Sequence, residues 1–190
     1  MKIGIVSDIH GNAAALEKAL CLMGETDELV CLGDSISQYK FSNETIGLLY
    51  SRKAHVIWGN HEEVFFSEAG KSARSAPWID QELLVWLQMQ PTRKLLTWLD
   101  QSLLLVHSTP WPSGSAYVCP HHSEFRRFAE AGTDYVLYGH THFPAVEKLG
   151  RTVVINPGSV GEHRYVDGLT ELSCAVLDLE SRHVTKISFS

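Results

Sequence analysis

The amino-acid sequence predicts an α/β fold in which two packed, mixed β-sheets are flanked by helices, and three observations support this. The N-terminal half alternates short apolar runs with stretches of helical periodicity, which is the pattern of βαβ units. Residues 92–107 have the pattern of a β-hairpin, and the chain beyond residue 134 consists of short strand-like runs separated by turns, with no further helix. The length of 190 residues suits one domain, residues 1–190, around a single core.

The first strand is predicted at Lys2–Ser7, after which Gly11 or Asn12 opens a helix. Gly24 stands where the C-terminal cap of this helix belongs. The apolar residues of the helix recur at helical spacing, at Leu16, Ala19, Leu20 and Met23. The remaining elements of this half are a strand, a helix and a strand, at Glu28–Gly33, about Ser42–Lys53 and Ala54–Trp58.

Residues 62–92 interrupt this alternation. They contain a predicted helix from Pro77 to about Gln90, which Pro91 closes. Two interpretations stay open: the segment is a lid or helical insertion beside a site, or its tryptophans and leucines simply pack on the core, as apolar positions at helical spacing usually do.

The rest of the chain is predicted to be mainly β-structure. The hairpin strands are Thr92–Leu99 and Ser102–His107, followed by a helix at His122–Ala131 that ends at Gly132. The next strand is predicted at Asp134–Tyr138. Turns then separate further short strands, at Lys148–Gly150, Asn156–Gly158 and Glu180–Ser181.

The formal net charge of −6 works against tight, sequence-independent binding of long nucleic acid, because such binding depends on clustered Lys and Arg that neutralise phosphates. We therefore expect no long nucleic acid as a partner. The closest basic pairs are interpreted as solvated helix or loop positions, at Arg52-Lys53, Arg93-Lys94 and Arg126-Arg127.

Asp8 and His10 break the apolar run of the first fifteen residues, which is too short for a signal peptide or a membrane span. We therefore expect a cytoplasmic protein without membrane association. The cysteines lack any CxxC pairing and lie in apolar stretches, which favours buried free thiols over disulfides or zinc ligands. They are Cys21, Cys31, Cys119 and Cys174.

Five polar segments each follow a predicted strand directly. They are Asp8-x-His10, Gly33-Asp34, Gly59-Asn60-His61-Glu62, His107 and Gly139-His140-Thr141-His142. Because the carboxyl ends of strands line one rim of an α/β sheet, residues far apart in the sequence can converge there. Glycine before Asp34, Asn60 and His140 permits the sharp backbone turns that such a rim requires.

Taken alone, each segment is a weak signal, because a lone histidine near an apolar strand is more often a hydrogen-bonded core residue than a ligand. Together, however, the segments contain five of the ten histidines. They gather Asp, His and Asn side chains without cysteine, which is the ligand set for Mn²⁺, Fe or Zn²⁺ rather than for a thiolate site. The sequence therefore predicts a metal site at this rim.

The ordered pattern resembles the calcineurin-like metallophosphoesterase superfamily. The tail Asn156-Pro157-Gly158-Ser159-Val160-Gly161 is similar to that of the small, single-domain bacterial and archaeal phosphodiesterase branch. The likeness spans Ile3 to Leu179, although residues 62–92 and 108–132 are poorly anchored by it. The resemblance implies two divalent metal ions per chain, of Mn, Fe, Zn or Ni. It implies that Asp8, His10 and His142 hold one ion, that Asn60, His107 and His140 hold the other, and that Asp34 bridges them.

The resemblance also implies a catalytic role for His61, which protonates the leaving alkoxide or binds a phosphoryl oxygen; a purely structural hydrogen bond is the alternative. Glu62 would orient a ligand loop, or it is simply a carboxylate favoured at a helix N-terminus. Arg164, just beyond the Asn-Pro-Gly-Ser turn, could reach substrate phosphate or be a surface charge. The segment after Asp34, Ser35–Tyr39, lacks the Asp and Arg of the phosphoprotein phosphatase branch, which disfavours phosphoprotein substrates.

What the resemblance implies for function is hydrolysis of a phosphoester by a metal-bridging hydroxide, with a small or nucleotide-like phosphodiester as the favoured substrate. A phosphomonoesterase with the same site is one alternative. A non-catalytic metal-binding scaffold is the other, since the family includes a trafficking-complex subunit of that kind. Aromatic residues within 78–111 would permit a homo-oligomer.

Overall fold

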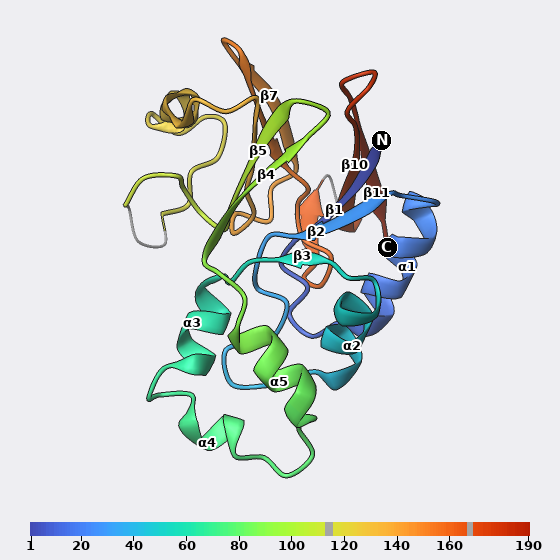
Figure 1. Ribbon diagram of the computed structural model, residues 1–190, viewed down its shortest axis with the longest axis vertical. Coiled ribbons are helices and arrows are strands. Elements are labelled where there is room, and N and C mark those ends of the chain that lie inside the picture. Colours follow the sequence, from blue (N-terminus) through green and yellow to red (C-terminus); the bar gives the residue numbers. More distant parts are fainter. Residues whose placement is uncertain (113–115, 167–168) are drawn as a thin grey trace.

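The computed structural model describes residues 1–112, 116–166 and 169–190, and two β-sheets with helices beside them form its framework (Figure 1). The first sheet has the order β11-β10-β1-β2-β3, with β9 paired to β10. Its strands are β1 (Lys2–Val6), β2 (Glu28–Cys31), β3 (His55–Val56), β9 (Arg164–Val166), β10 (Leu169–Asp178) and β11 (His183–Phe189). The second sheet has the order β4-β5-β6-β8-β7. Its strands are β4 (Arg93–Trp98), β5 (Gln101–Val106), β6 (Tyr135–Leu137), β7 (Ala145–Leu149) and β8 (Thr152–Asn156).

Both sheets are mixed, as predicted. In the first sheet β1 pairs parallel with β2 and antiparallel with β10. In the second sheet β5 pairs parallel with β6 and antiparallel with β4, and the two form the expected hairpin. The helices are α1 (Ala13–Met23), α2 (Asn43–Ser51), α3 (Asn60–Phe66), α4 (Lys71–Arg74), α5 (Gln81–Gln88) and the 3₁₀ helix η1 (Phe125–Ala131).

The two sheets pack face to face through a buried apolar layer, and the period-2 alternation of their strands decides which residues enter it. In β2 and just beyond it, Val30 and Leu32 face this layer, whereas Leu29 and Cys31 face the helices. The second sheet contributes residues such as Leu103 to the same layer. The predicted sandwich therefore has one core between its sheets and further cores on its outer faces.

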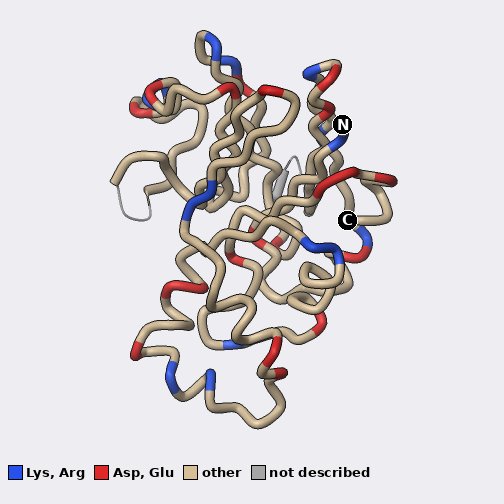
Figure 2. The backbone as a smooth tube through the Cα atoms, in the orientation of Figure 1, with Lys and Arg blue, Asp and Glu red and all other residues tan. Residues whose placement is uncertain are grey.

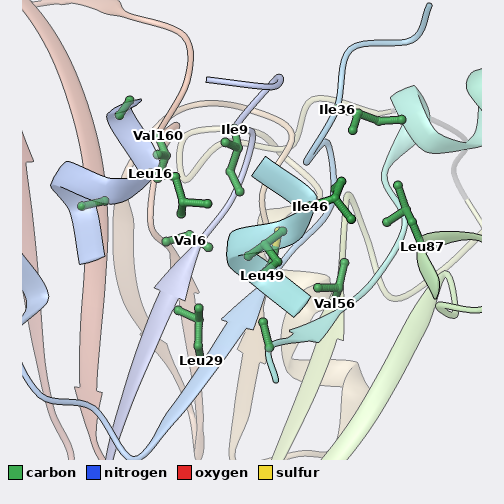
Figure 3. Packing of buried hydrophobic residues seen from close by; sticks show 14 of the residues in the cluster. Val6, Ile9, Leu16, Leu29, Ile36, Ile46, Leu49, Val56, Leu87 and Val160 are labelled. Atoms are coloured by element: carbon green, nitrogen blue, oxygen red, sulfur yellow. The ribbon is translucent and has the colours of Figure 1, made fainter. Parts of the chain in front are cut away.

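Helices α1, α2 and α5 cover the outer face of the first sheet (Figure 3). Helix α1 begins at Asn12, whose side chain accepts a hydrogen bond from the backbone N–H of Ala15, and it ends at Gly24 with φ 69°, as predicted. Helix α2 begins at Ser42, which caps it through the backbone N–H of Thr45. These caps fix where each helix starts relative to the sheet.

Residues 62–92 hold more helix than the sequence indicates. The predicted helix is present as α5, but it begins at Gln81 because Asp80 caps it through the backbone N–H groups of residues 82 and 83. Helix α4 was not predicted, and α3 was indicated only by the interpretation of Glu62 as a carboxylate at a helix N-terminus. Ile79, Leu84 and Leu87 are buried in the core beside the first sheet, which fits the interpretation that this segment packs on the core. Met89 is 79% exposed.

Two further expectations need correction. The helix predicted at His122–Ala131 is a 3₁₀ helix that begins at Phe125, and its buried residues Phe125 and Phe128 lie three positions apart, the spacing that aligns side chains in a 3₁₀ helix. It ends at Gly132 in the left-handed conformation, as predicted. Of the four free cysteines, Cys31 and Cys174 are buried as expected, but Cys119 is only partly buried and Cys21 is exposed on α1.

Several strands end one or two residues earlier than predicted. β2 stops at Cys31 rather than Gly33, β3 at Val56 rather than Trp58, and β6 at Leu137 rather than Tyr138. At each of these points the chain turns toward the polar segment that follows. Separately, none of the helices in the described ranges is both long enough and apolar enough to span a bilayer.

Candidate metal centre

The carboxyl ends of five strands deliver polar side chains to one rim. Asp8 and His10 follow β1, Asp34 follows β2, Asn60 and His61 begin α3 after β3, His107 follows β5, and His140 and His142 follow β6. The structure brings all eight residues together in overlapping groups of potential ligand atoms, with Asn60 joined to them through His107.

The first group consists of Asp8, His10 and His142, whose ligand atoms lie within 4.8 Å of one another. His142 Nε2 lies 3.3 Å from both His10 Nε2 and Asp8 Oδ1. Asp8 Oδ2 accepts a hydrogen bond from the backbone N–H of His140, but the fully buried Oδ1 accepts none from the described residues. A buried carboxylate oxygen without a donor, facing two imidazole nitrogens, fits a bound cation.

The second group consists of Asp34, His107 and His140. His107 Nε2 lies 3.3 Å from Asp34 Oδ2 and 3.1 Å from the Asn60 side-chain oxygen. His107 Nδ1 lies 2.7 Å from the Leu32 carbonyl oxygen, so it must be the protonated nitrogen of the neutral ring, and Nε2 is left to bind an ion. Asp34 also belongs to a third group, with His10 and His61. Since His10 is a member of the first group, this third group joins the first group to the second.

Glu62 holds the Asp34 segment in place. This fully buried carboxylate accepts hydrogen bonds from the backbone N–H groups of Asp34, Ser35 and Ile36, and from that of Gly59 at the start of α3. The Ser35 hydroxyl donates a further bond. Burial and the Asp34 charge raise the pKa of Glu62, while these donors oppose that shift. Both roles expected for Glu62, as a helix N-terminal carboxylate and as a support for a ligand loop, are therefore met by one side chain.

The backbone of the rim is strained. The left-handed conformation, with φ between 50° and 64°, is adopted by Asp8, His10, Asp34, His140 and His142. Non-glycine residues pay for this conformation in free energy, and the strain persists only where surrounding contacts fix the chain. Four further non-glycine residues with positive φ, Lys53, Leu99, Asp100 and Arg182, are not candidate ligands, but the other five all belong to the candidate ligand set.

The turn at residues 156–161 supplies part of that fixation. The Ser159 hydroxyl and the Gly161 N–H both donate to the Asp8 carbonyl oxygen. The Asn156 side chain donates to the Gly139 carbonyl oxygen at 2.8 Å, just before His140. A Cβ atom at Gly161 would clash with the backbone of Ile9, so this close approach requires glycine. The Asn-Pro-Gly-Ser turn thus supports the loops after β1 and β6.

Three imidazoles of the two groups have shifted pKa values. Burial would lower the pKa of His107, but its contacts with Asp34 outweigh burial and raise it to about 9. For His142 the Asp8 carboxylate likewise outweighs burial and raises the pKa. Burial lowers the pKa of His10. A cation that binds His107 must therefore displace a proton, as metal ligands in proteins commonly require.

His61 lies beside the two groups. Its backbone N–H donates to Asp34 Oδ1 at 2.8 Å, and its ring Nδ1 lies 3.2 Å from His10 Nδ1. Its ring Nε2 lies 4.0 Å from Asp34 Oδ2. Arg164 begins β9, but its side chain lies outside the described part of the structure. That it reaches substrate phosphate stays a prediction.

Glu162 is a site residue that the sequence interpretation missed. Its carboxylate lies 3.6 Å from His142 Nδ1 and 3.9 Å from His10 Nε2. A carboxylate near the outer nitrogen of His142 favours a proton on Nδ1, which would leave Nε2 for an ion. No motif marks Glu162 in the sequence; only its position directly after the turn at 156–161 could have suggested it.

Comparisons with known proteins agree with this geometry. The family model described as the calcineurin-like phosphoesterase superfamily domain matches residues 1–182. Phosphodiesterase YfcE of Escherichia coli strain K12 is 28% identical over 162 residues, which cover 84% of this chain and 79% of that protein.

Two solved structures are similar in fold. The crystal structure of a metallophosphoesterase from Sphaerobacter thermophilus aligns with a TM-score of 0.72 and 23% identity, covering 100% of this chain and 89% of that one. An archaeal phosphodiesterase aligns with a TM-score of 0.65 and 24% identity, covering 100% of both chains. Both likenesses support the assignment of two mixed sheets flanked by helices.

Proposed function

This chain belongs to the calcineurin-like phosphoesterase superfamily and is a metal-dependent phosphoesterase, and on that basis we propose that it hydrolyses a small or nucleotide-like phosphodiester at a centre of two divalent metal ions. The observation that carries the proposal is the presence of two neighbouring ligand groups, Asp8 with His10 and His142, and Asp34 with His107 and His140. Asp, His and Asn donors without cysteine suit Mn²⁺, Fe, Zn²⁺ or Ni²⁺, and we favour manganese.

We assign Asp8, His10 and His142 to one ion, Asn60, His107 and His140 to the other, and Asp34 to both. A carboxylate has two oxygens and can bridge, whereas a neutral imidazole or an amide oxygen contributes one bond to one ion. The membership of Asp34 in two of the three groups supports this division. Since Asp8 and Asp34 balance only half the charge of two divalent ions, the centre stays positive and attracts a phosphoryl group.

When bound by these residues, two divalent ions would supply a hydroxide nucleophile at neutral pH and would stabilise charge on the phosphoryl oxygens. The protein orients His61 for the leaving group. If His10 Nε2 faces its ion, His10 Nδ1 carries the proton and donates to His61 Nδ1, 3.2 Å away. The proton of neutral His61 is then on Nε2, the atom that faces the Asp34 side of the centre. His61 is in this way set to protonate the departing alkoxide.

The same proposal treats residues 1–190 as one cytoplasmic catalytic domain in which residues 62–92 form a helical insertion. Its partner is a small phosphoester rather than a long nucleic acid. Lys and Arg positions are scattered among Asp and Glu positions along the chain, without a continuous basic track in the described ranges (Figure 2). The exposed side chain of Trp78 would permit association into a homo-oligomer.

Metal analysis joined to a hydrolysis assay tests the proposal. Elemental analysis of the purified protein should find two divalent ions per chain, and removal of both by a chelator should abolish cleavage of bis-nitrophenyl phosphate. Activity should return with Mn²⁺. A protein that holds metal but cleaves no phosphoester with Mn²⁺, Ni²⁺, Zn²⁺ or Mg²⁺ would support the scaffold alternative, and full activity without metal would contradict the centre itself.

The second expectation concerns substrate class. Bis-nitrophenyl phosphate should be cleaved with a kcat/KM at least about tenfold above that for nitrophenyl phosphate, equivalent to ~1.4 kcal/mol of transition-state stabilisation. The segment after Asp34 offers no Arg for the extra charge of a monoester. Its two serine hydroxyls are already bound, Ser35 to Glu62 and Ser37 to the His10 carbonyl oxygen. The relative named a phosphodiesterase points the same way. A strong preference for the monoester would overturn this expectation.

A further inference from the structure

A pocket of about 370 Å³ opens beside the candidate centre, on the side of Asn60 and His107. Its other lining residues come from three separate segments. These are Trp58, Gly59 and Glu63 at the beginning of α3, Thr92 and Arg93 at the start of β4, and the residues on either side of His107, from 106 to 112. The residues that give the pocket its chemistry are Trp58, Glu63, Arg93 and Trp111. Since Asn60 and His107 belong both to the pocket and to the second ligand group, a molecule bound there would touch the proposed centre.

The register of the hairpin places Arg93 next to this centre. Arg93 is the first residue of β4 and pairs with Val106, the residue before His107. Successive residues of a strand point to opposite faces, and Lys94 accordingly points away, with its Nζ 3.3 Å from His55 Nδ1. Of this basic pair, which stands out at the start of β4 in Figure 2, only Arg93 lines the pocket.

Arg93 has no acid to neutralise it. Within residues 1–112, 116–166 and 169–190, its guanidinium forms neither a hydrogen bond nor an ion pair. In a chain of net charge −6, an unpaired cation beside a metal centre is a site for an anion. Arginine offers a planar fork of donors that matches a phosphate group.

Two tryptophans form rigid walls. Trp58 stacks on Phe66 with ring centroids 4.8 Å apart, and its indole N–H donates to the Leu87 carbonyl oxygen at 2.7 Å. Trp111 is packed against Phe128 and lies 4.4 Å from the Arg127 guanidinium. Side chains fixed in this way lose little freedom when a ligand binds. Flat aromatic walls of this kind suit a planar nucleobase, because every base has a π-face that can stack on tryptophan.

We propose that this pocket is the subsite for the nucleotide part of the substrate. A base packs against the Trp58 and Trp111 walls, and a second phosphate of the same nucleotide pairs with Arg93. The bond that breaks is the ester bond of the phosphate at the centre: water adds to that phosphorus and the alkoxide leaves with a proton. Glu63, on the rim of the same pocket, offers an acceptor for a sugar hydroxyl and disfavours a phosphate on its own side. The volume falls in the range of small-molecule sites. This inference rests on the proposed function and specifies its substrate as a nucleotide with at least two phosphates.

The test uses binding rather than turnover, with Mn²⁺-loaded protein and isothermal titration calorimetry. The probes are adenosine 5′-(α,β-methylene)diphosphate, methylenediphosphonate and inorganic phosphate. Arg93→Gln should weaken binding of the nucleotide and of the diphosphonate about tenfold or more, because one charge-assisted contact is lost, while phosphate binding changes less than about twofold. Lys94→Gln removes the same charge from the same strand and should leave all three affinities unchanged. The wild-type protein should bind the nucleotide more tightly than the diphosphonate.

The outcomes separate this inference from the proposed function. Equal losses for the nucleotide and for phosphate, or equal losses in Arg93→Gln and Lys94→Gln, would show that only the general field of the protein matters and would overturn the subsite. If the protein binds the nucleotide no more tightly than the diphosphonate, the proposal that the base packs in this pocket is wrong. Because none of these measurements needs hydrolysis, an inactive protein that still binds in the expected order would contradict the proposed function alone.

Discussion

Replacing Asp34 by asparagine should remove most of the bound metal and lower phosphoester hydrolysis by about 10³-fold or more, equivalent to ~4 kcal/mol of transition-state stabilisation. Asp34 lies 3.3 Å from His107 and shares one ligand group with His140 and another with His10. Asparagine has one acceptor oxygen in place of two and carries no charge, so it cannot bridge two cations. Elemental analysis after gel filtration measures the loss.

Asn60→Ala is the matched comparison for this substitution. Asn60 is hydrogen-bonded to His107, which we assign to the same ion, so its loss should affect that ion and leave the other. Asp34→Asn should therefore cost more metal than Asn60→Ala. Equal occupancy losses in the two variants would contradict the proposed division of ligands. Because Asp34 is buried, circular dichroism should first establish that both variants remain folded.

His61→Ala should keep both metal ions and still lose roughly 10²–10⁴ in rate, the usual effect of removing a positioned acid or base. The reason is the geometry of its ring. Nδ1 contacts His10, and Nε2 lies 4.0 Å from Asp34 Oδ2. The loss should be small for a nitrophenolate leaving group, which needs little protonation. It should be large for an alkoxide such as a ribose hydroxyl.

Leaving-group dependence therefore decides the role of His61. A rate loss of the same size on both kinds of substrate would point instead to electrostatic stabilisation of the phosphoryl oxygens. A loss of metal content, measured on the same preparations, would show that His61 supports the ligand geometry and that the assignment as an acid is wrong. The backbone N–H of residue 61, which donates to Asp34, is retained in the alanine variant.

The sequence predicted the candidate site more sharply than the helices around it. Asp8, Asp34 and His107 are recognisable because each stands directly after an apolar run, and the carboxyl ends of strands share one rim whatever the connections are. The extent of helix α3 was missed because it is only seven residues long and begins inside a motif, at Asn60. Its stability comes from the buried contacts of Phe65 rather than from a pattern of its own.

What the sequence could not indicate depends on register and distance. Arg93 was interpreted as part of a solvated basic pair, since nothing local shows that it lines a pocket together with His107 while Lys94 points to the other face. Glu162 likewise has no signal apart from its distance to His142. The 3₁₀ form of η1 follows from how Phe125 and Phe128 fit the second sheet, which is a tertiary effect that overrides propensity.

Each proposed ion takes ligands from both sheets, since Asp8 and Asp34 follow strands of the first sheet, whereas His107 and His142 follow strands of the second. Neither half of the chain can assemble a complete set of ligands alone. We therefore expect an ion to bind late in folding, after the two sheets have met. An ion that binds only at this stage stabilises the native state without stabilising the folding transition state, so it slows unfolding and leaves the folding rate nearly unchanged. With metal bound, the sandwich should therefore unfold more slowly than after chelation, while its folding rate stays nearly the same.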